Sequence, residues 1–197
     1  MSLDLGCAYG VASLAALKQG ANIVACDMDL GHVQVLLSKV EESQKNRIEG
    51  VVSQMPDIAF QPACFSAILC ARALHFLDRD DVTATVTAMA EWLTPGGKVF
   101  LIADTPYTGF WARGAGNYEK RKSAGDPWPG FIPDVTVYLP EQARSNANMR
   151  QLNPMDPDTL AQVCKKAGLT VEHAAFSGRP DQPESRTHAG VIAAKQR

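Results

Sequence analysis

The sequence predicts an α/β fold: a doubly wound, mostly parallel seven-stranded sheet that finishes in an antiparallel hairpin. Three observations predict it. Apolar runs of strand length alternate with helix-length segments over about the first 100 residues. A glycine-bearing turn stands between the first apolar run and the first helix. Two further apolar runs flank a turn-rich segment at the end of the chain, which indicates the hairpin.

Each expected element has a local signal. The second helix carries Val33, Leu36 and Val40 at helical spacing. A proline and two glycines at 95–97 end the third helix, and Asp156 with the proline after it opens the last one. Strands are expected at 3–5, 21–27, 47–53, 65–71, 98–103, 169–175 and 189–194, and helices at 11–19, 30–44, 80–93 and 157–167.

The composition suits one domain over residues 1–197. Of these, 46% are hydrophobic and 20% charged, enough to bury an ordinary core. The net charge is −2 with no Lys/Arg run, so no nucleic-acid partner is indicated. No apolar stretch approaches the about 20 residues that a membrane span needs, and no signal peptide is visible. Five cysteines without a C-x-x-C pair predict reduced, buried thiols in a cytoplasmic protein, and no metal site.

The turn after the first strand is spaced for a cationic ligand. Gly6 and Gly10 are four residues apart with Ala8 between them, unlike the G-x-G-x-x-G fingerprint of dinucleotide-binding proteins. Asp4 stands inside the preceding strand, where a carboxylate would repel a pyrophosphate and suit an ammonium group. The helix that follows directs its unpaired N–H groups out of the same turn. The turn therefore favours a ligand that carries positive charge.

Two stretches resemble the class I S-adenosylmethionine-dependent methyltransferases of the small-molecule type. Residues 3–10, L-D-L-G-C-A-Y-G, are similar to the family's first motif, and residues 93–102, L-T-P-G-G-K-V-F-L-I, are typical of the link into its fifth strand. Ala8 at the middle glycine and Ser66 at a common aspartate depart from the pattern. The resemblance implies a Rossmann-like methyltransferase fold, S-adenosyl-L-methionine as cofactor and S-adenosylhomocysteine as product. The implied reaction moves a methyl group to an oxygen, nitrogen or carbon of a small organic acceptor.

An acid at the end of the second strand supports a nucleoside ligand. Asp27 follows Gly6 by 21 residues, and a carboxylate about 20 residues after such a turn can accept hydrogen bonds from ribose hydroxyls. The alternative for Asp27 is a helix N-cap. The resemblance implies that Asp4 and Gly6 hold the methionine end, and that the adenine lies near Gln54 between two methionines, for which core filling is the alternative. The expected cofactor-binding residues are Asp4, Gly6, Cys7, Ala8, Gly10, Asp27, Met28, Gln54, Met55 and Cys70.

His75 and Tyr107 are the candidate catalytic residues. Residues 72–77, R-A-L-H-F-L, resemble a loop that often holds histidines in this family. Either side chain could take the proton of a hydroxyl acceptor. The alternative for His75 is a hydrogen bond that braces the backbone, and Tyr107 could instead line the substrate pocket.

Residues 104–154 lack a clear periodicity and are crowded with prolines and aromatic rings. A long insert of this kind in a compact domain is typical of a lid or binding loop. The resemblance places a substrate-recognition insert here. The alternative is a surface excursion with a small core of its own.

Two other functions stay open. A nucleotide- or NAD-dependent enzyme can use the same doubly wound sheet, although the glycine spacing and Asp4 argue against it. A non-catalytic binding protein with a degenerate methyltransferase fold is the second, favoured by Ala8 and Ser66. Only Met1 and Ser2 precede the first strand, so the N-terminal cover helices of the family are absent. We expect either a fragment or an unusually open cofactor pocket.

Overall fold

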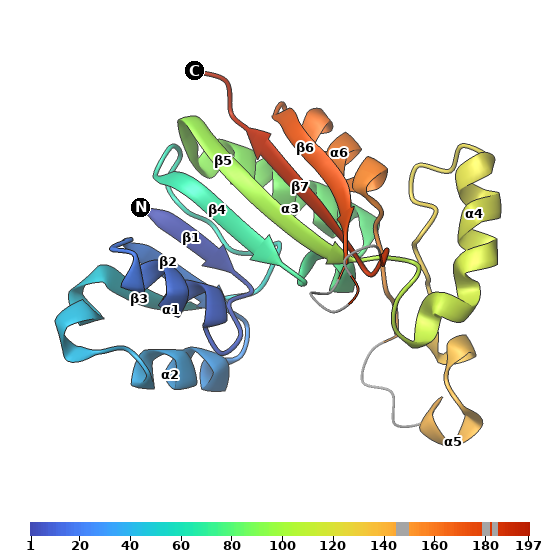
Figure 1. Cartoon of the computed structure of the whole chain (residues 1–197), viewed down its shortest axis with the longest axis horizontal. Coiled ribbons are helices and arrows are strands. Elements are labelled where there is room, and N and C mark those ends of the chain that lie inside the picture. Colours follow the sequence, from blue (N-terminus) through green and yellow to red (C-terminus); the bar gives the residue numbers. More distant parts are fainter. Residues whose placement is uncertain (145–149, 179–181, 183–184) are drawn as a thin grey trace.

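The computed structural model describes residues 1–144, 150–178, 182 and 185–197, and these form one seven-stranded sheet (Figure 1). The strand order is β3-β2-β1-β4-β5-β7-β6. The first five strands run parallel, while β7 is antiparallel to both β5 and β6. The predicted doubly wound sheet with its terminal hairpin is therefore confirmed. The strands are β1 Ser2–Leu5, β2 Ile23–Asp27, β3 Ile48–Val52, β4 Phe65–Ala71, β5 Leu93–Asp104, β6 Thr170–Ser177 and β7 His188–Ala194.

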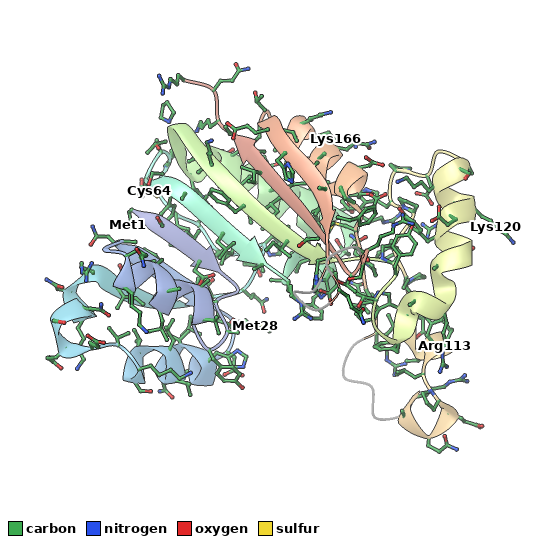
Figure 2. The ribbon with its side chains drawn as sticks, viewed as in Figure 1. Met1, Met28, Cys64, Arg113, Lys120 and Lys166 are labelled. Carbon is green, nitrogen blue, oxygen red and sulfur yellow. The ribbon has the colours of Figure 1, made fainter. Side chains whose placement is uncertain are left out.

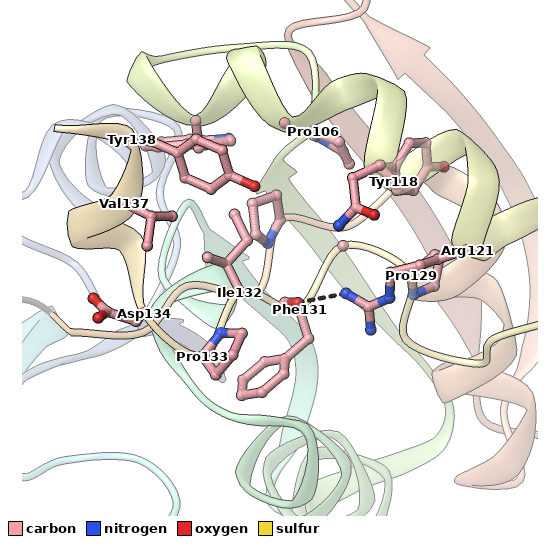
Figure 3. A pocket seen from close by; sticks show the side chains of 15 residues that line it. Pro106, Tyr118, Arg121, Pro129, Phe131, Ile132, Pro133, Asp134, Val137 and Tyr138 are labelled. Atoms are coloured by element: carbon pink, nitrogen blue, oxygen red, sulfur yellow. Dashed lines mark hydrogen bonds between the residues drawn. The ribbon is translucent and has the colours of Figure 1, made fainter.

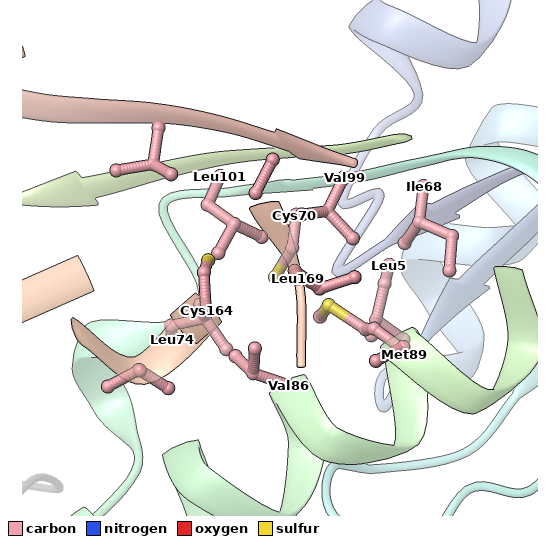
Figure 4. Close-up of a cluster of buried hydrophobic side chains, with 14 of the residues drawn as sticks. Leu5, Ile68, Cys70, Leu74, Val86, Met89, Val99, Leu101, Cys164 and Leu169 are labelled. Carbon is pink, nitrogen blue, oxygen red and sulfur yellow. The ribbon is translucent and has the colours of Figure 1, made fainter. Parts of the chain in front are cut away.

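Alternation along the strands divides the core between the two faces of the sheet. In β2, Val24 and Cys26 join the main core, and Ile23 and Ala25 point to a smaller core on the other face. The main core lies between the sheet and two helices, α3 and α6 (Figure 4). The smaller one lies under α1 and α2. The longer helices are α1 Val11–Lys18, α2 Leu30–Ser38, α3 Arg79–Trp92, α4 Ala115–Ser123 and α6 Pro157–Lys166, and a single turn, α5, spans Glu141–Arg144.

Two predicted element bounds are wrong. The second helix was expected to reach residue 44 but ends at Ser38, and Glu42–Arg47 forms a separate 3-10 helix. No residue of that 3-10 helix is buried, so nothing apolar extends α2 along the sheet. The fifth strand begins at Leu93 rather than at residue 98, because Leu93 already pairs with Phe65. The proline–glycine stretch ends α3 as predicted and is absorbed into β5 as an irregularity in the register.

The insert holds helices that the sequence did not predict. Helix α4 and a 3-10 helix at Phe110–Gly114 stand to one side of the sheet, with α5 beside them (Figure 1). Helix α4 buries only Tyr118 among its nine residues, so it has no apolar stripe that a periodicity search would detect. None of the helices in the described part of the chain combines the length and hydropathy that a membrane span requires.

We expect the buried side chains of β5 to contribute more to the free energy of unfolding than the exposed ones. Leu101 is 1% exposed in the main core, whereas its neighbour Phe100 lies on the opposite face and is 37% exposed. We expect Leu101→Ala to lower the free energy of unfolding by about 2–5 kcal/mol, because it removes buried methyl groups and leaves a cavity. Phe100→Ala should cost clearly less. Urea titration of both variants tests this, and equal losses would contradict the assignment of the two faces.

Candidate functional site

The strand order reverses between β1 and β4, because β2 and β3 extend the sheet on one side and β5 on the other. In open α/β sheets, ligands bind in the crevice at the carboxyl ends of the strands that flank such a point. Parallel pairing places the ends of β1, β2 and β4 on one edge of the sheet. The turn at 6–10 follows β1 at this edge, Asp27 ends β2, and Ala71 ends β4. These segments form the candidate site.

The turn between β1 and α1 is left-handed at three positions. The backbone φ is 78° at Gly6, 45° at Ala8 and 80° at Gly10. Space also requires both glycines: a Cβ on Gly6 would lie 2.7 Å from Ala73 Cβ, and one on Gly10 would lie 2.0 Å from Leu36 Cδ1. Ala8 adopts the conformation despite its side chain, at a cost of about 1–2 kcal/mol for a residue other than glycine. Packing on both sides thus determines the shape of the turn.

The Asp27 carboxylate connects this turn to the second strand. Its Oδ2 accepts a hydrogen bond from the Ala8 N–H at 2.8 Å, and its Oδ1 accepts one from the Asp29 N–H at 3.0 Å. His32 Nδ1 lies 3.0 Å from the same Oδ1. Burial alone would raise the pKa of this carboxyl, but these hydrogen bonds hold it below its ordinary value. Asp29 is the N-cap of α2, so the N-cap alternative for Asp27 is wrong.

Asp4 supports the turn from the side of α1. Its side chain is buried, and Ser13 Oγ donates to its Oδ2 at 2.6 Å. The Ser13 N–H donates to it as well, so Asp4 satisfies a backbone group in the first turn of the helix. Burial raises the pKa of the carboxyl. The enclosed acid thus stabilises the start of the helix, and its contact with the methionine end of a ligand stays a prediction.

The side chains of Cys7 and Cys70 lie in the core, and their contact with a cofactor stays a prediction. Cys70 is fully buried in the same cluster as Leu5 and Leu101 (Figure 4). Burial raises the pKa of its thiol to about 12. Cys7 packs in the smaller core with Leu36, and burial raises its pKa to about 12 as well. Both thiols therefore serve as small apolar groups.

The residues expected at the adenine lie in different environments. Met28 follows β2 directly and is 71% exposed, at the edge where the turn lies (Figure 2). Gln54 is exposed, and its Nε2 donates to Asp57 Oδ2 at 3.3 Å. Met55 packs against the main core, which supports the core-filling alternative for this methionine. Met28 and Gln54 stay predicted adenine contacts.

A charged cluster that the sequence analysis missed lies at the ends of β4, β5 and β7. Arg72 binds the buried Asp104 carboxylate through Nε at 2.8 Å and Nη2 at 3.2 Å. His75 Nε2 and His188 Nε2 lie 3.8 Å and 3.5 Å from the two carboxylate oxygens. The backbone of Arg72 is in the left-handed conformation, with φ 58°, and its side chain is 61% exposed. A sequence signal did exist, because Asp104, like Asp27, is an acid that ends an apolar strand.

His75 is enclosed in this cluster. Its side chain is 2% exposed, and its Nδ1 accepts a hydrogen bond from the Asp104 N–H at 3.3 Å. Burial lowers the pKa of the imidazole to about 4, against the opposite effect of the Asp104 charge. A neutral ring whose acceptor nitrogen is occupied is not set up to take a proton from a ligand. The geometry supports the alternative in which His75 braces the backbone.

Tyr107 lies at the start of the insert, and its role as a base stays a prediction. Its hydroxyl donates to Glu119 Oε1 and accepts from Arg186 Nη2, and the Arg186 guanidinium lies 3.8 Å from the ring centroid. Burial and the Glu119 carboxylate raise the pKa of the phenol to about 12. The phenol therefore keeps its proton at neutral pH.

The insert has a small core and a cavity of its own (Figure 3). Trp111, Val135 and Leu152 are buried together, as the excursion alternative predicts. A cavity of about 230 Å³ lies beside them, lined by the rings of Trp111, Tyr118, Phe131 and Tyr138 with prolines between them. Tyr107 does not line it. An apolar lining of rings suits a flat, largely apolar ligand.

A buried amide lies where the insert meets the loop after β4. The Asn153 N–H donates to His75 O at 2.8 Å. Within the described part of the chain, neither atom of the fully buried Asn153 side-chain amide has a hydrogen-bond partner. Leaving such a group unpaired costs about 1–3 kcal/mol. At this junction between the insert and the sheet, the Asn153 side-chain amide is thus left without hydrogen bonds.

The crevice fits the cofactor that the resemblance implies. Gly6 and Gly10 carry no side chain, and the ionised Asp27 can accept from ribose hydroxyls. The exposed Met28 thioether offers apolar surface beside Asp27. The fit rests on the turn and Asp27, since Asp4 is enclosed.

Comparison with known proteins agrees with this geometry. Residues 3–97 match the family model described as "Methyltransferase domain". The cypemycin N-terminal methyltransferase of Streptomyces sp is 31% identical over 106 residues, which are 53% of this chain and 42% of that protein. The ubiquinone biosynthesis O-methyltransferase of Xylella fastidiosa (strain 9a5c) is 35% identical over 100 residues, which are 50% of this chain and 39% of that protein. The chain thus spans about two fifths of these relatives.

A solved structure shares the fold along the whole chain. It is the Burkholderia thailandensis 1,6-didemethyltoxoflavin-N1-methyltransferase, with bound 1,6-didemethyltoxoflavin and S-adenosylhomocysteine. The TM-score is 0.67 at 15% identity, and the match covers all of this chain and 71% of that chain. At this identity the likeness concerns the fold alone.

The enclosed His75 should make stability depend on pH. The unfolded chain binds a proton at this residue near the ordinary histidine pKa of about 6.5, whereas the folded state does so only near pH 4. Stability should therefore fall as the pH is lowered through this window, by at most about 1.4 kcal/mol per pH unit for one proton. His75→Gln, which still offers an acceptor to the Asp104 N–H, should reduce this slope, as measured by urea unfolding at several pH values. The exposed His173→Gln is the control, and a slope unchanged in His75→Gln would contradict the assignment.

Proposed function

We infer the activity of this chain from one premise: residues 3–97 belong to the methyltransferase-domain family, among the class I S-adenosylmethionine-dependent methyltransferases. We propose that the chain is an S-adenosylmethionine-dependent methyltransferase that moves a methyl group to an oxygen, nitrogen or carbon nucleophile of a small organic acceptor. The observation that carries the proposal is the ionised Asp27 bonded to the glycine turn. The S-adenosylhomocysteine named in the structure of the Burkholderia enzyme supports the same cofactor.

In the proposed complex, the cofactor lies across the ends of β1 and β2. Asp27 accepts hydrogen bonds from the ribose hydroxyls, and the turn at 6–10 holds the methionine end. Met28 and Gln54 contact the adenine, with Met55 behind them in the core. When bound, S-adenosylmethionine supplies a reactive sulfonium methyl group for in-line displacement.

The acceptor is proposed to bind between the crevice and the insert at 104–154. Trp111 joins the two regions, because its ring lines the cavity and its centroid lies 6.5 Å from that of His75. Its Nε1 donates to Thr105 O at 2.9 Å, which fixes the ring beside the end of β5. The ring-lined cavity supports a small acceptor with a flat apolar part.

Catalysis is proposed to rest on alignment and on the exclusion of water. His75 is enclosed and Tyr107 keeps its proton, so neither side chain is set up as a general base. Holding two reactants in line can supply about 7–11 kcal/mol without any proton transfer by the protein. An acceptor that is already nucleophilic, such as an amine or a carboxylate, fits this arrangement.

We place the protein in the cytoplasm, in keeping with its five free cysteines, of which four are buried. The proposed partner is the small acceptor alone. The net charge of −2 offers no field that would attract a nucleic-acid backbone.

Binding of S-adenosylhomocysteine is the direct test of the proposal. We expect calorimetry to detect it, and Asp27→Asn to weaken it about tenfold or more, because an amide offers one acceptor oxygen where the carboxylate offers two. Asp80→Asn, on the exposed side of α3, is the matched control. Thermal stabilisation by NAD instead would favour the nucleotide-dependent alternative. A folded protein that binds neither ligand would favour a non-catalytic scaffold.

The cavity should determine the acceptor. Tyr138→Ala removes one ring from its wall, and we expect kcat/KM for a ring-containing acceptor to fall about tenfold or more, mainly through KM. Transfer of labelled methyl to a panel of phenols, aromatic amines and ring carboxylic acids provides the assay. The affinity for S-adenosylhomocysteine should stay within about twofold. Phe100→Ala, on the open sheet face, is the control, and an unchanged KM in Tyr138→Ala would remove the cavity from the acceptor site.

A further inference from the structure

His32 is a titratable side chain that the proposed mechanism does not use. It lies in the first turn of α2 and faces the end of β2, with Nδ1 3.0 Å from Asp27 Oδ1 and Nε2 4.0 Å from Asp29 Oδ2. Its ring meets the Tyr9 ring edge-on, with 4.6 Å between the centroids. The side chain is 30% exposed, against 10% for Asp27. His32 therefore covers the carboxylate from the solvent side.

The donors on Asp27 differ in how easily they can move. The Ala8 N–H and the Asp29 N–H belong to the backbone of the turn and of the helix start. Displacing either of them would require refolding of that segment. The third donor in the described part of the chain is the His32 imidazole, which swings away by rotation about two side-chain bonds. An ionised carboxylate only accepts hydrogen bonds, so the ring proton between the two lies on Nδ1 of His32.

We propose that His32 is a placeholder for the cofactor's ribose: its Nδ1–H occupies the Asp27 oxygen to which a ribose hydroxyl donates once the nucleoside binds. This rests on the proposed function, since it presupposes a ribose at Asp27. Tyr9 holds the ring in place by its edge contact, and its own 52% exposure leaves it free to move aside with the ring. His32 is thus a positioning residue whose displacement is part of cofactor binding.

The groups around His32 hold its ring over Asp27. Asp27 and Asp29 both face the ring. Lys39 lies on the Tyr9 side, where its Nζ is 5.7 Å from the Tyr9 centroid and donates to Tyr9 O at 3.4 Å. When the ribose binds, it has to replace the hydrogen bond between His32 and Asp27, and breaking that bond costs part of the binding free energy. Removing the imidazole should therefore raise the affinity for the cofactor.

The experiment compares binding of S-adenosylhomocysteine to the full chain, to His32→Ala and to His173→Ala by calorimetry. His32→Ala should bind about threefold to tenfold more tightly than the wild type, because the ribose no longer has to displace a donor from Asp27. His173→Ala, on exposed β6, should behave like the wild type. If His32→Ala is poorly folded by circular dichroism, His32→Leu takes its place.

The outcomes separate this inference from the function on which it rests. A wild type that binds no S-adenosylhomocysteine overturns the proposed function. If the wild type binds but His32→Ala binds no more tightly, the placeholder role is overturned and the function stands. As a direct readout, the His32 ring resonances in NMR spectra should shift on addition of S-adenosylhomocysteine. Unchanged resonances at saturation would also overturn the displacement.

Discussion

The hydrogen bond from the Ala8 N–H to Asp27 is the contact on which the candidate site depends. Parallel pairing aligns Leu5 with Cys26, so the ends of β1 and β2 are level. The Gly6 N–H donates to Cys26 O at 2.8 Å, and the chain then turns so that the Ala8 N–H meets the next side chain of β2. A nearly buried carboxylate requires such donors to stay ionised. The register of β1 and β2 therefore determines where the turn lies, and the turn supplies the donor that keeps Asp27 ionised.

Another buried carboxylate connects the insert to the sheet domain in the same way. Asp156 caps α6 by accepting from the Thr159 N–H at 2.8 Å. It also accepts from the Tyr118 hydroxyl and from Lys122 Nζ, both on α4. Burial would raise its pKa, but these donors hold the pKa below its ordinary value. Breaking a buried pair of this kind leaves an uncompensated charge, so the placement of the insert depends on electrostatics as much as on its small core.

What the sequence predicted correctly is what local pattern determines. The doubly wound sheet with its terminal hairpin, the turn and the acid at its partner strand follow from apolar runs, glycine spacing and an offset of 21 residues between Gly6 and Asp27. Side-chain direction was harder to predict. Asp4 is on the face of α1 because alternation turns it away from the main core, and its partner Ser13 is nine residues away. His32 and Arg72 acquired their roles through contacts that no spacing rule encodes.

The turn at 6–10 holds Ala8 in a left-handed conformation. Ala73 and Leu36 occupy the space that a side chain at Gly6 or Gly10 would need, so packing on both sides fixes the turn around Ala8 with its φ of 45°. The bond to Asp27 offsets part of the strain. A site whose backbone is already arranged loses little conformational entropy when it binds. The remaining cost then lies in side chains at its rim, and this is where His32 occupies the carboxylate.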